Sequence, residues 1–269
     1  MPERHCQDLD ALVADVDDGT KIAIAPDYSG VAIAATRALI RKRAKRLHLI
    51  AVPQAGLQAD LLIGAGCVGT LECAGVNLGE YGLAPRFTDW VQQGLITMRD
   101  ATCPAIHAGL QAAEKGIPFM PLRGILGSDL LNVRPDWRVI DNPYRHDDPI
   151  VLIPAIAPDV ALFHAALADR QGNVWIGVRR ELMLMAHAAR RTLVTVEAMQ
   201  EHSLLEDPAF AAGTIPALYV SRICVAPGGM RPLGFAAIGE AVDGAALEAY
   251  VGAARTQAGF DAYVAAWQT

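Results

Sequence analysis

A loop after the first apolar run of the chain has residue types that can bind an anionic group. The loop, Pro26–Asp27–Tyr28–Ser29–Gly30, follows Lys21–Ala25 and opens a stretch with helical periodicity. Backbone N–H groups at the start of a helix have no intrahelical acceptor, so they can bind a phosphate or a developing oxyanion. Asp, Ser and Gly are equally expected at any helix start, and an ordinary strand-to-helix turn is the alternative.

A second loop, Arg99–Pro104, combines a carboxylate with a thiol. Asp100 precedes Cys103 by three residues, and His107 follows Cys103 by one helical turn. A cysteine acts as a nucleophile when a neighbouring cation or a helix amino terminus stabilises its thiolate, and His107 is the nearby candidate. We interpret Cys103 as a packed thiol and His107 as a surface side chain, because free cysteines generally pack as small hydrophobic residues.

Three further ionisable side chains lie in or beside apolar or glycine-containing segments, where each is expected to have a binding partner. Glu72 lies in an apolar stretch, where a carboxylate is costly unless paired, so we expect it at a cleft or in contact with Arg123 or Arg86. Glu80 lies beside glycines and is expected to brace a loop by accepting backbone N–H bonds, or to contact a ligand. His164 ends an apolar, strand-like run and is interpreted as a hydrogen-bonded core histidine.

Alternating strand-like and helix-like runs predict the frame that positions these residues. Lys21–Ala25 and Leu47–Val52 are typical of buried strands, and the stretch from Val31 to Arg43 between them is typical of a helix. The later runs are strands at Leu95–Met98, Ile150–Ile153, Val160–Ala165 and Thr192–Val196, and helices at Ala105–Lys115 and Arg180–Arg190. We therefore expect an α/β fold with a central, mostly parallel sheet and helices on both faces. In such sheets ligands bind at the carboxyl ends of the strands.

The absence of a long linker or low-complexity stretch predicts a single domain over residues 1–269. We expect this domain to close with a helical segment at about 245–269, interrupted near Gly259. The apolar side chains of the segment predict that it packs on the core or at a subunit interface.

Composition and charge exclude several classes of protein. The net charge of −6 gives no positive field for a nucleic-acid partner, and the basic run 41–46 is expected to be a solvated helix end, with binding of a nucleotide phosphate as the alternative. No apolar run reaches the ~20 residues that span a bilayer, and the polar start of the chain lacks a signal core, so we expect a cytoplasmic protein. Five scattered cysteines predict neither disulfides nor a metal site.

Several segments share their motifs, order and spacing with one protein family. The most specific segment runs from Gly116 to Asp129, where Gly-Ile-Pro-Phe-Met-Pro is followed by Leu-Gly-Ser-Asp. Supporting segments are Asp18–Ile22, Ala65–Val68, Glu80–Phe87, Ala168–Val174, Thr195–Glu197 and Ala226–Pro232. Together they resemble the alpha (A) subunit of family I CoA-transferases, the group that includes the glutaconate CoA-transferase A subunit. The resemblance covers most of the chain.

The resemblance implies an enzyme that moves CoA between carboxylic acids. It implies a homologous beta subunit, in a heterodimer or heterotetramer, whose glutamate is the nucleophile, with coenzyme A as substrate and no tightly bound cofactor. It also implies that the chain itself supplies substrate-binding rather than catalytic residues, namely Pro26, Asp27, Tyr28, Ser29, Gly30, Glu80, Gly127 and Ser128. We expect the loop Pro26–Gly30 and the turn Gly127–Asp129 to face one cleft, because both should follow strands of the sheet.

Two other functions remain open at this point. The chain also resembles two-subunit relatives that are hydrolases. These enzymes act on ring-derived or keto-acid CoA thioesters and use a carboxylate of their alpha subunit as the base. Cys103 here stands near the place of that carboxylate, with Asp100 three residues earlier. The family's glycine-rich loop is replaced by Pro26–Gly30, in which Pro26 has no N–H group and Asp27 brings a negative charge. The second alternative is a non-catalytic subunit that completes a partner's pocket, which the absence of an obvious nucleophile in this chain keeps open.

Overall fold

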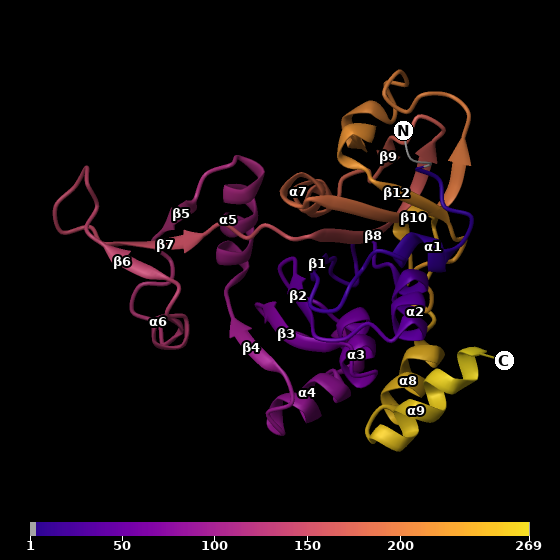
Figure 1. The fold of residues 1–269 in the computed structure, drawn as a ribbon, viewed down its shortest axis with the longest axis horizontal. Helices are drawn as coiled ribbons and strands as arrows, with labels where there is room; N and C mark the ends of the chain where they lie inside the picture. Colours follow the sequence, from indigo (N-terminus) through magenta and orange to yellow (C-terminus); the bar gives the residue numbers. More distant parts are fainter. Residues whose placement is uncertain (1–3, 269) are drawn as a thin grey trace.

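The structure is a computed structural model that describes residues 4–268, and in this part of the chain nine strands form the central sheet (Figure 1). Its parallel strands lie side by side in the order β12 (Arg222–Val225), β10 (Arg191–Gln200), β8 (Val160–Asp169), β1 (Lys21–Ile24), β2 (Leu47–Ala51), β3 (Val68–Cys73) and β4 (Thr97–Asp100). Two short strands, β9 (Val174–Trp175) and β11 (Thr214–Ile215), extend it in antiparallel fashion. The side chains of Ile22, Ala23 and Ile24 in the middle of the sheet are fully buried, as expected for a strand covered on both faces.

Helices cover the sheet in two groups. On one face α1 (Leu9–Val13), α2 (Ile33–Lys42), α3 (Leu57–Gly64) and α4 (Pro85–Gln92) pack successively against one another, and on the other α5 (Cys103–Glu114) packs against α7 (Arg180–Ala188). Every residue of α3 is buried, which makes it an interior helix rather than an amphipathic one. The expected α/β architecture is confirmed.

A second, three-stranded sheet projects from the central sheet (Figure 1). We call residues 119–154 the arm; it contains β5 (Phe119–Leu122), α6 (Leu130–Val133), β6 (Arg138–Ile140) and β7 (Ile150–Pro154). The prediction of a strand at Ile150–Ile153 is confirmed, but its place in the parallel sheet is wrong, because β7 pairs antiparallel with β5 and β6. An apolar run alone does not tell a buried parallel strand from the centre of a small antiparallel sheet.

The carboxyl-terminal helices pack on α3 and α4 of the same chain. They are α8 (Gly244–Ala253) and α9 (Gln257–Ala265), and their side chains Tyr250 and Phe260 are buried in the core. The interruption lies at residues 254–256 instead of near Gly259, because the Thr256 side chain caps α9 by accepting the N–H of Gly259. The two helices thus cover this chain's own core.

Short helices and loops complete the chain. The 3-10 helices are η1 (Gly79–Tyr81), η2 (Ala211–Gly213), η3 (Ala217–Tyr219), η4 (Ala236–Ile238) and η5 (Ala266–Gln268). The basic run ends α2 as an exposed cap, confirming the solvated helix end: Arg43 is left-handed and the Lys42 ammonium donates to the carbonyls of Val13 and Val16. The strand expected at Leu95–Met98 begins two residues later, because Leu95 is exposed and its N–H closes α4 on the Trp90 carbonyl. No helix within residues 4–268 is both long and apolar enough to cross a membrane.

Candidate active site

A cavity of about 510 Å³ opens at the carboxyl ends of three neighbouring parallel strands. We call it the first cavity. The loops after β1, β2 and β3 line it with Asp27, Gln54 and Asn77, and the segment 233–242 closes it from the other side. This is the position expected for a ligand in an open α/β sheet, and the volume is typical of a small-molecule pocket.

A second cavity, of about 260 Å³, adjoins the first. It lies between the loop after β1, the carboxyl half of β8 and the segment 175–179, and its lining is mostly apolar, with Trp175 and Phe235 contributing rings. Tyr28, Arg179 and Ala236 line both cavities, so these side chains stand at the junction.

Asp27 holds an unusual carboxyl group at the edge of the first cavity. Its Oδ2 accepts the N–H of Leu57 at 2.9 Å, which caps α3, while its Oδ1 is buried without a hydrogen-bond partner in the described chain. Burial raises the pKa of Asp27 to about 7, the Leu57 N–H opposes the shift, and the Asp60 carboxylate adds to it. The helix that Asp27 caps is therefore α3, not the α2 that its own loop opens.

The rest of the loop is held rigidly against β8 and α7. Pro26 is buried, and the Ser29 hydroxyl, only 1% exposed, donates to Oε1 of Glu181 in the first turn of α7. Gly30 has a φ of +123°, and a Cβ at this position would lie 2.4 Å from the carbonyl oxygen of His164. Only glycine fits there, because no other residue tolerates both the backbone conformation and the contact. A turn closed by the Ser29 N–H on the Pro26 carbonyl places Asp27 and Tyr28 at the loop's tip.

Tyr28 is the exposed residue of this loop, with 54% of its surface accessible. The guanidinium carbon of Arg179 lies 5.5 Å from the centroid of its ring, within the range of a cation–π contact. Desolvation and the Glu181 carboxylate raise the pKa of Tyr28, while Arg179 opposes them and Cys103 adds a smaller contribution. The loop Pro26–Gly30, the start of α7 and the start of α5 therefore face one region.

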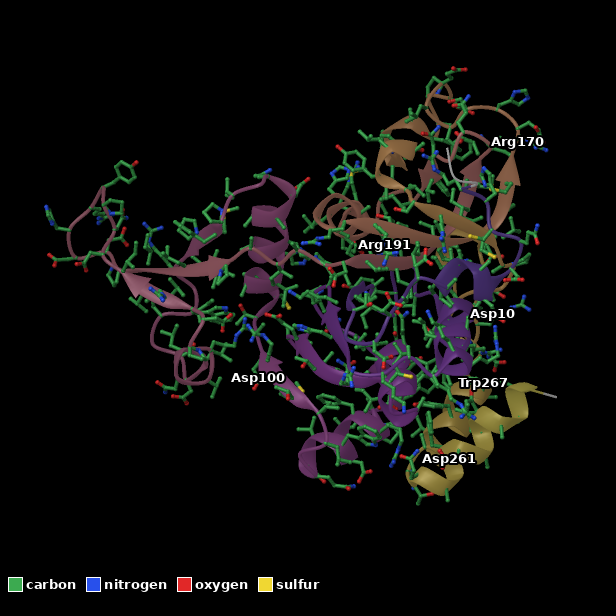
Figure 2. The ribbon with its side chains drawn as sticks, in the orientation of Figure 1. Asp10, Asp100, Arg170, Arg191, Asp261 and Trp267 are labelled. Atoms are coloured by element: carbon green, nitrogen blue, oxygen red, sulfur yellow. The ribbon has the colours of Figure 1, made fainter. Side chains whose placement is uncertain are left out.

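The second candidate loop lies at this region's edge. Asp100 ends β4, exposed, where the chain turns into α5 (Figure 2). Cys103 is the first residue of α5 and is exposed, so the interpretation as a packed thiol is wrong; the helix begins two residues before the predicted Ala105 and leaves the side chain in solvent. His107 is half-buried, and burial lowers its pKa despite the Glu181 carboxylate. Neither Asp100 nor Cys103 lines the two cavities.

Other predicted site residues divide between the cavity and the arm. Glu80 is exposed on η1, whose neighbours Gly79 and Tyr81 line the first cavity, and its carboxylate adds to the desolvation that raises the pKa of Tyr81. Gly127 and Ser128 are exposed in the arm, where the Ser128 hydroxyl donates to the Ile125 carbonyl at 2.7 Å. They follow β5 of the small sheet, so the expectation that this turn and the loop Pro26–Gly30 follow strands of one sheet is wrong.

The two remaining polar residues have structural partners. Glu72 is 4% exposed and pairs with Arg134 at 2.7 Å and with Arg99 at 3.4 Å, so the expected contact with Arg123 or Arg86 is wrong. The interpretation of His164 as a core histidine is confirmed, because Thr195 and Glu197 bind its two ring nitrogens at 2.9 and 2.8 Å.

Arg179 and Glu181 were not identified as site residues from the sequence. Their signal is the sequence Arg179–Arg180 at the start of a predicted helix, where cations oppose the helix dipole and Ser, Thr, Asp or Asn is the usual cap. A residue that is unfavourable for its own secondary structure, and that no neighbouring residue compensates, often belongs to a functional site. Their distance from residue 28 in the chain gives no hint of the contact.

Residues 6–226 match the family model described as coenzyme A transferase. The chain is similar to the A subunit of 3-oxoadipate CoA-transferase from Pseudomonas knackmussii, with 33% identity over 224 residues that cover 81% of this chain and 77% of that protein. It is also similar to the IpdA subunit of the cholesterol ring-cleaving hydrolase from Mycobacterium tuberculosis, with 29% identity over 98% of this chain and 92% of that protein.

Among solved structures, the fold is similar to glutaconate coenzyme A-transferase from Acidaminococcus fermentans. The TM-score is 0.87 at 27% identity, and the alignment covers 98% of this chain and 88% of that chain. The likeness therefore extends through the carboxyl-terminal helices, beyond residue 226 where the family match ends.

Proposed function

Because the chain belongs to the coenzyme A transferase family, we propose that it is the A-type subunit of a two-subunit enzyme that moves CoA between carboxylic acids. The observation that carries the proposal is the first cavity at the carboxyl ends of β1, β2 and β3, with the loop Pro26–Gly30 at its edge, in a fold that matches a solved CoA-transferase over 98% of the chain. This is the place where the loop can meet a thioester.

In this proposal a homologous partner subunit supplies a glutamate that takes CoA from the acyl group and passes it to the acceptor acid. A carboxylate nucleophile divides one difficult exchange into two steps of similar energy. This chain holds the acyl group. The N–H groups of Asp27 and Tyr28 have no acceptor among residues 4–268, which leaves them available to a thioester oxygen. Pro26 is no obstacle, because it lies one residue before these two donors.

The experiment is to co-express the chain with a homologous chain from its genomic neighbourhood, confirm the complex by size-exclusion chromatography, and incubate it with an acyl-CoA. Hydroxylamine or borohydride trapping should then label a glutamate of the partner and no residue of this chain. Failure of the two chains to co-purify contradicts the proposal.

The second candidate function is a CoA-thioester hydrolase, favoured by the similarity to the IpdA subunit over 98% of this chain. The candidate base is Asp100 or Cys103, both exposed where β4 meets α5. Release of an acid by water without a trapped intermediate, lost on Asp100→Asn or Cys103→Ala, would select the hydrolase. An assembled complex with neither activity would select the non-catalytic subunit.

A further inference from the structure

Two carboxyl groups of the first cavity each have a buried oxygen without a hydrogen-bond partner among residues 4–268. These oxygens are Oδ1 of Asp27, in the loop after β1, and Oε2 of Glu240, in the segment that closes the cavity. Glu240 is paired through its other oxygen with the guanidinium of Arg231. Asp27 has no such cation beside it within the described chain, so a negative charge on its carboxyl group would be buried without compensation.

The start of α3 holds the Asp27 carboxyl group in place. Its Oδ2 accepts the N–H of Leu57 at 2.9 Å. Gly56 makes room for the group, because a Cβ at this position would lie 2.1 Å from Oδ2 and 2.5 Å from Cγ of Asp27. The carboxyl group is thus fixed at one oxygen, and its other oxygen stays buried.

The ionisable side chains around the first cavity do not supply a cation to Asp27. They are Tyr28 of the loop, Asp60 of α3, Tyr81 of η1, Arg179 and Glu181 at the start of α7, and Glu240. Arg179 lies over the ring of Tyr28, where the Glu181 carboxylate counteracts its effect on the pKa of Tyr28. Burial raises the pKa of Asp27 to about 7, and the Asp60 carboxylate adds to this shift against the Leu57 N–H. Below pH 7 the Asp27 carboxyl group is therefore mostly neutral.

The loop that contains this carboxyl group also contains the two free donors of the proposed site. The N–H groups of Asp27 and Tyr28 have no acceptor among residues 4–268, and both residues line the first cavity. The carboxyl group belongs to the same residue as the first of these N–H groups, so only a few atoms separate it from an oxygen bound there. A carboxylate in this position repels an oxyanion, whereas the neutral acid does not.

We propose that Asp27 works as a neutral, protonated acid, which allows the N–H groups beside it to stabilise the oxyanion of a reacting thioester. This inference rests on the proposed function. A carboxylate oxygen of the partner's glutamate adds to the thioester carbon, and the carbonyl electron pair moves onto the oxygen. Collapse of this oxyanion expels the CoA thiolate and leaves an anhydride. The thiolate then attacks the glutamyl carbon of the anhydride and releases the acid as a carboxylate, while the proton on Asp27 stays in place.

The test is the pH dependence of CoA transfer from acetyl-CoA to the partner's glutamate, measured by rapid quenching of the assembled complex. The wild-type rate constant should fall about tenfold per pH unit above about pH 7, because the neutral form of Asp27 is titrated there. Asp27→Asn has a similar shape and is neutral at every pH. It should reduce the ratio of the rate constants at pH 6 and pH 9 from about 100 to close to one.

Glu240→Gln is the matched control, because it changes the other carboxyl group of the cavity that has an unpartnered oxygen. This variant should keep the fall above pH 7. A fall that persists in Asp27→Asn, or that disappears only in Glu240→Gln, would overturn the proposal. A wild-type rate constant that is the same at pH 6 and pH 9 would overturn it as well.

Calorimetric titration separates this inference from the proposed function, because binding requires no turnover. The probe is the ketone analogue of acetyl-CoA in which a methylene group replaces the sulfur, so it keeps the carbonyl oxygen but cannot transfer CoA. Its affinity for the wild-type complex should fall about 3- to 10-fold from pH 6 to pH 9, and its affinity for Asp27→Asn should stay constant. This pattern in a complex that transfers no CoA would retain the inference and reject the function. CoA transfer with affinity for the probe that does not depend on pH would reject the inference alone.

Discussion

Asp27 combines two features that oppose each other at neutral pH. Its Oδ2 caps α3, an interaction that favours the carboxylate, while its Oδ1 is buried without a partner, which favours the acid. Burial dominates and raises the pKa of Asp27 from 3.8 to about 7. The unfolded chain releases this proton near pH 4, whereas the folded chain keeps it up to about pH 7.

Asp27→Asn should therefore stabilise the protein increasingly as the pH rises from 4 to 8. Between pH 4 and 8 the native state binds more protons than the unfolded state, so the free energy of unfolding of the wild-type protein falls as the pH rises. This loss of stability is complete once the pH exceeds the pKa of Asp27 in the folded state. At pH 8 the free energy of unfolding of the variant should exceed that of the wild-type protein by a few kcal/mol. The size of the pKa shift sets an upper limit of about 4 kcal/mol. Urea unfolding at several pH values measures it.

Asp141→Asn is the control, because Asp141 is an exposed carboxylate in the arm. It should change stability by the same small amount at every pH. A pH-independent effect of Asp27→Asn would mean that the Asp27 carboxyl is ionised throughout this range.

The residues of the site differ in how far the sequence could reveal them. The loop Pro26–Gly30 was predictable, because a strand followed by a helix start fixes its place at the sheet edge. Arg179 and Glu181 also lie beside this loop, but in the chain they follow β8, a hairpin and a further loop. The periodicity of the local sequence does not predict where such a connection places them. The exposure of Cys103 depends on a helix boundary two residues from the predicted one, and helix ends are uncertain at this scale.

At the scale of elements, the two carboxyl-terminal helices show why position decides the effect of a glycine. Gly252 lies in the last part of α8, and a Cβ there meets no atom within 4 Å. Gly259 lies in the first turn of α9, where a Cβ would stand 2.2 Å from the carbonyl oxygen of Ala253. The sequence suggested a break at Gly259, yet this glycine permits close contact between the helices.

Gly252→Ala should raise the free energy of unfolding by about 0.5–1 kcal/mol, because alanine loses less conformational entropy in a helix. Gly259→Ala should lower it by about 1–3 kcal/mol, because backbone must move to relieve the overlap. Thermal and urea unfolding of both variants measures the difference. Similar effects at the two positions would contradict the packing described for α8 and α9.

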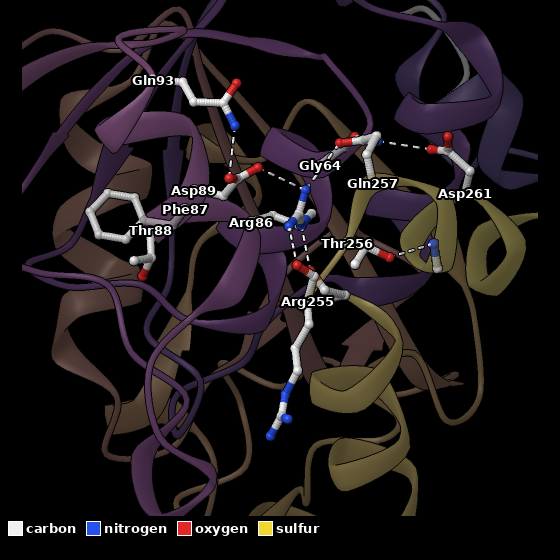
Figure 3. A network of polar contacts seen from close by, with 12 residues as sticks. Gly64, Arg86, Phe87, Thr88, Asp89, Gln93, Arg255, Thr256, Gln257 and Asp261 are labelled. Carbon is white, nitrogen blue, oxygen red and sulfur yellow. Dashed lines mark hydrogen bonds and ion pairs between the residues drawn. The ribbon is translucent and has the colours of Figure 1, made fainter.

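Arg86 connects these helices to the rest of the molecule (Figure 3). Its side chain is 1% exposed and donates to the carbonyls of Ala254 and Arg255, to Gln257 at 3.2 Å and to Asp89 at 3.1 Å. These carbonyls end α8, so the guanidinium both fills their free acceptor positions and complements the dipole.

Arg86→Met should destabilise the protein by about 2–4 kcal/mol, because it leaves buried carbonyls without donors. Hydrogen exchange should increase most in residues 244–265, the helices that lose their anchor. Arg255→Met provides the comparison, because the Arg255 side chain is exposed and takes part through its carbonyl alone. Uniform exchange through the whole chain would mean that Arg86 supports the general core instead.

At the scale of the whole molecule, the parallel sheet was predictable and the arm was not. In the buried strand Lys21–Ile24 every residue after Lys21 is apolar and buried, because both faces of the sheet meet helices, and this pattern is visible in the sequence. In the arm β6 is exposed along its length and β5 alternates, so its strands have no such signature. The pairing of β5, β6 and β7 is set by contacts across the arm.

A network of charges holds the base of the arm to the central sheet. Arg134, 3% exposed and next to α6, binds Glu72 of β3 at 2.7 Å, Asp136 at 2.9 Å and the carbonyl of Asp100 at 3.0 Å. Arg99 of β4 joins Asp136 to Glu72. Burial opposes ionisation of Glu72, but its pKa is lowered, first by the contact with His48 and then by the charges of Arg134 and Arg99. The arm is therefore anchored by a buried ion pair at the sheet's last two strands.

Removing one partner of this pair should cost more than removing both. Arg134→Met leaves the Glu72 carboxylate buried with weaker partners and should destabilise the protein by about 3–5 kcal/mol, with faster proteolysis of residues 119–154. Glu72→Leu combined with Arg134→Met exchanges the pair for apolar side chains and should recover much of that loss, because no uncompensated charge remains. Arg138→Met, on the exposed strand β6, controls for loss of an arginine from the arm. Urea unfolding and limited proteolysis of the wild type and the three variants measure these differences. A double variant as unstable as Arg134→Met would show that the arm is attached by shape and packing, and that the charges at its base contribute little to holding it.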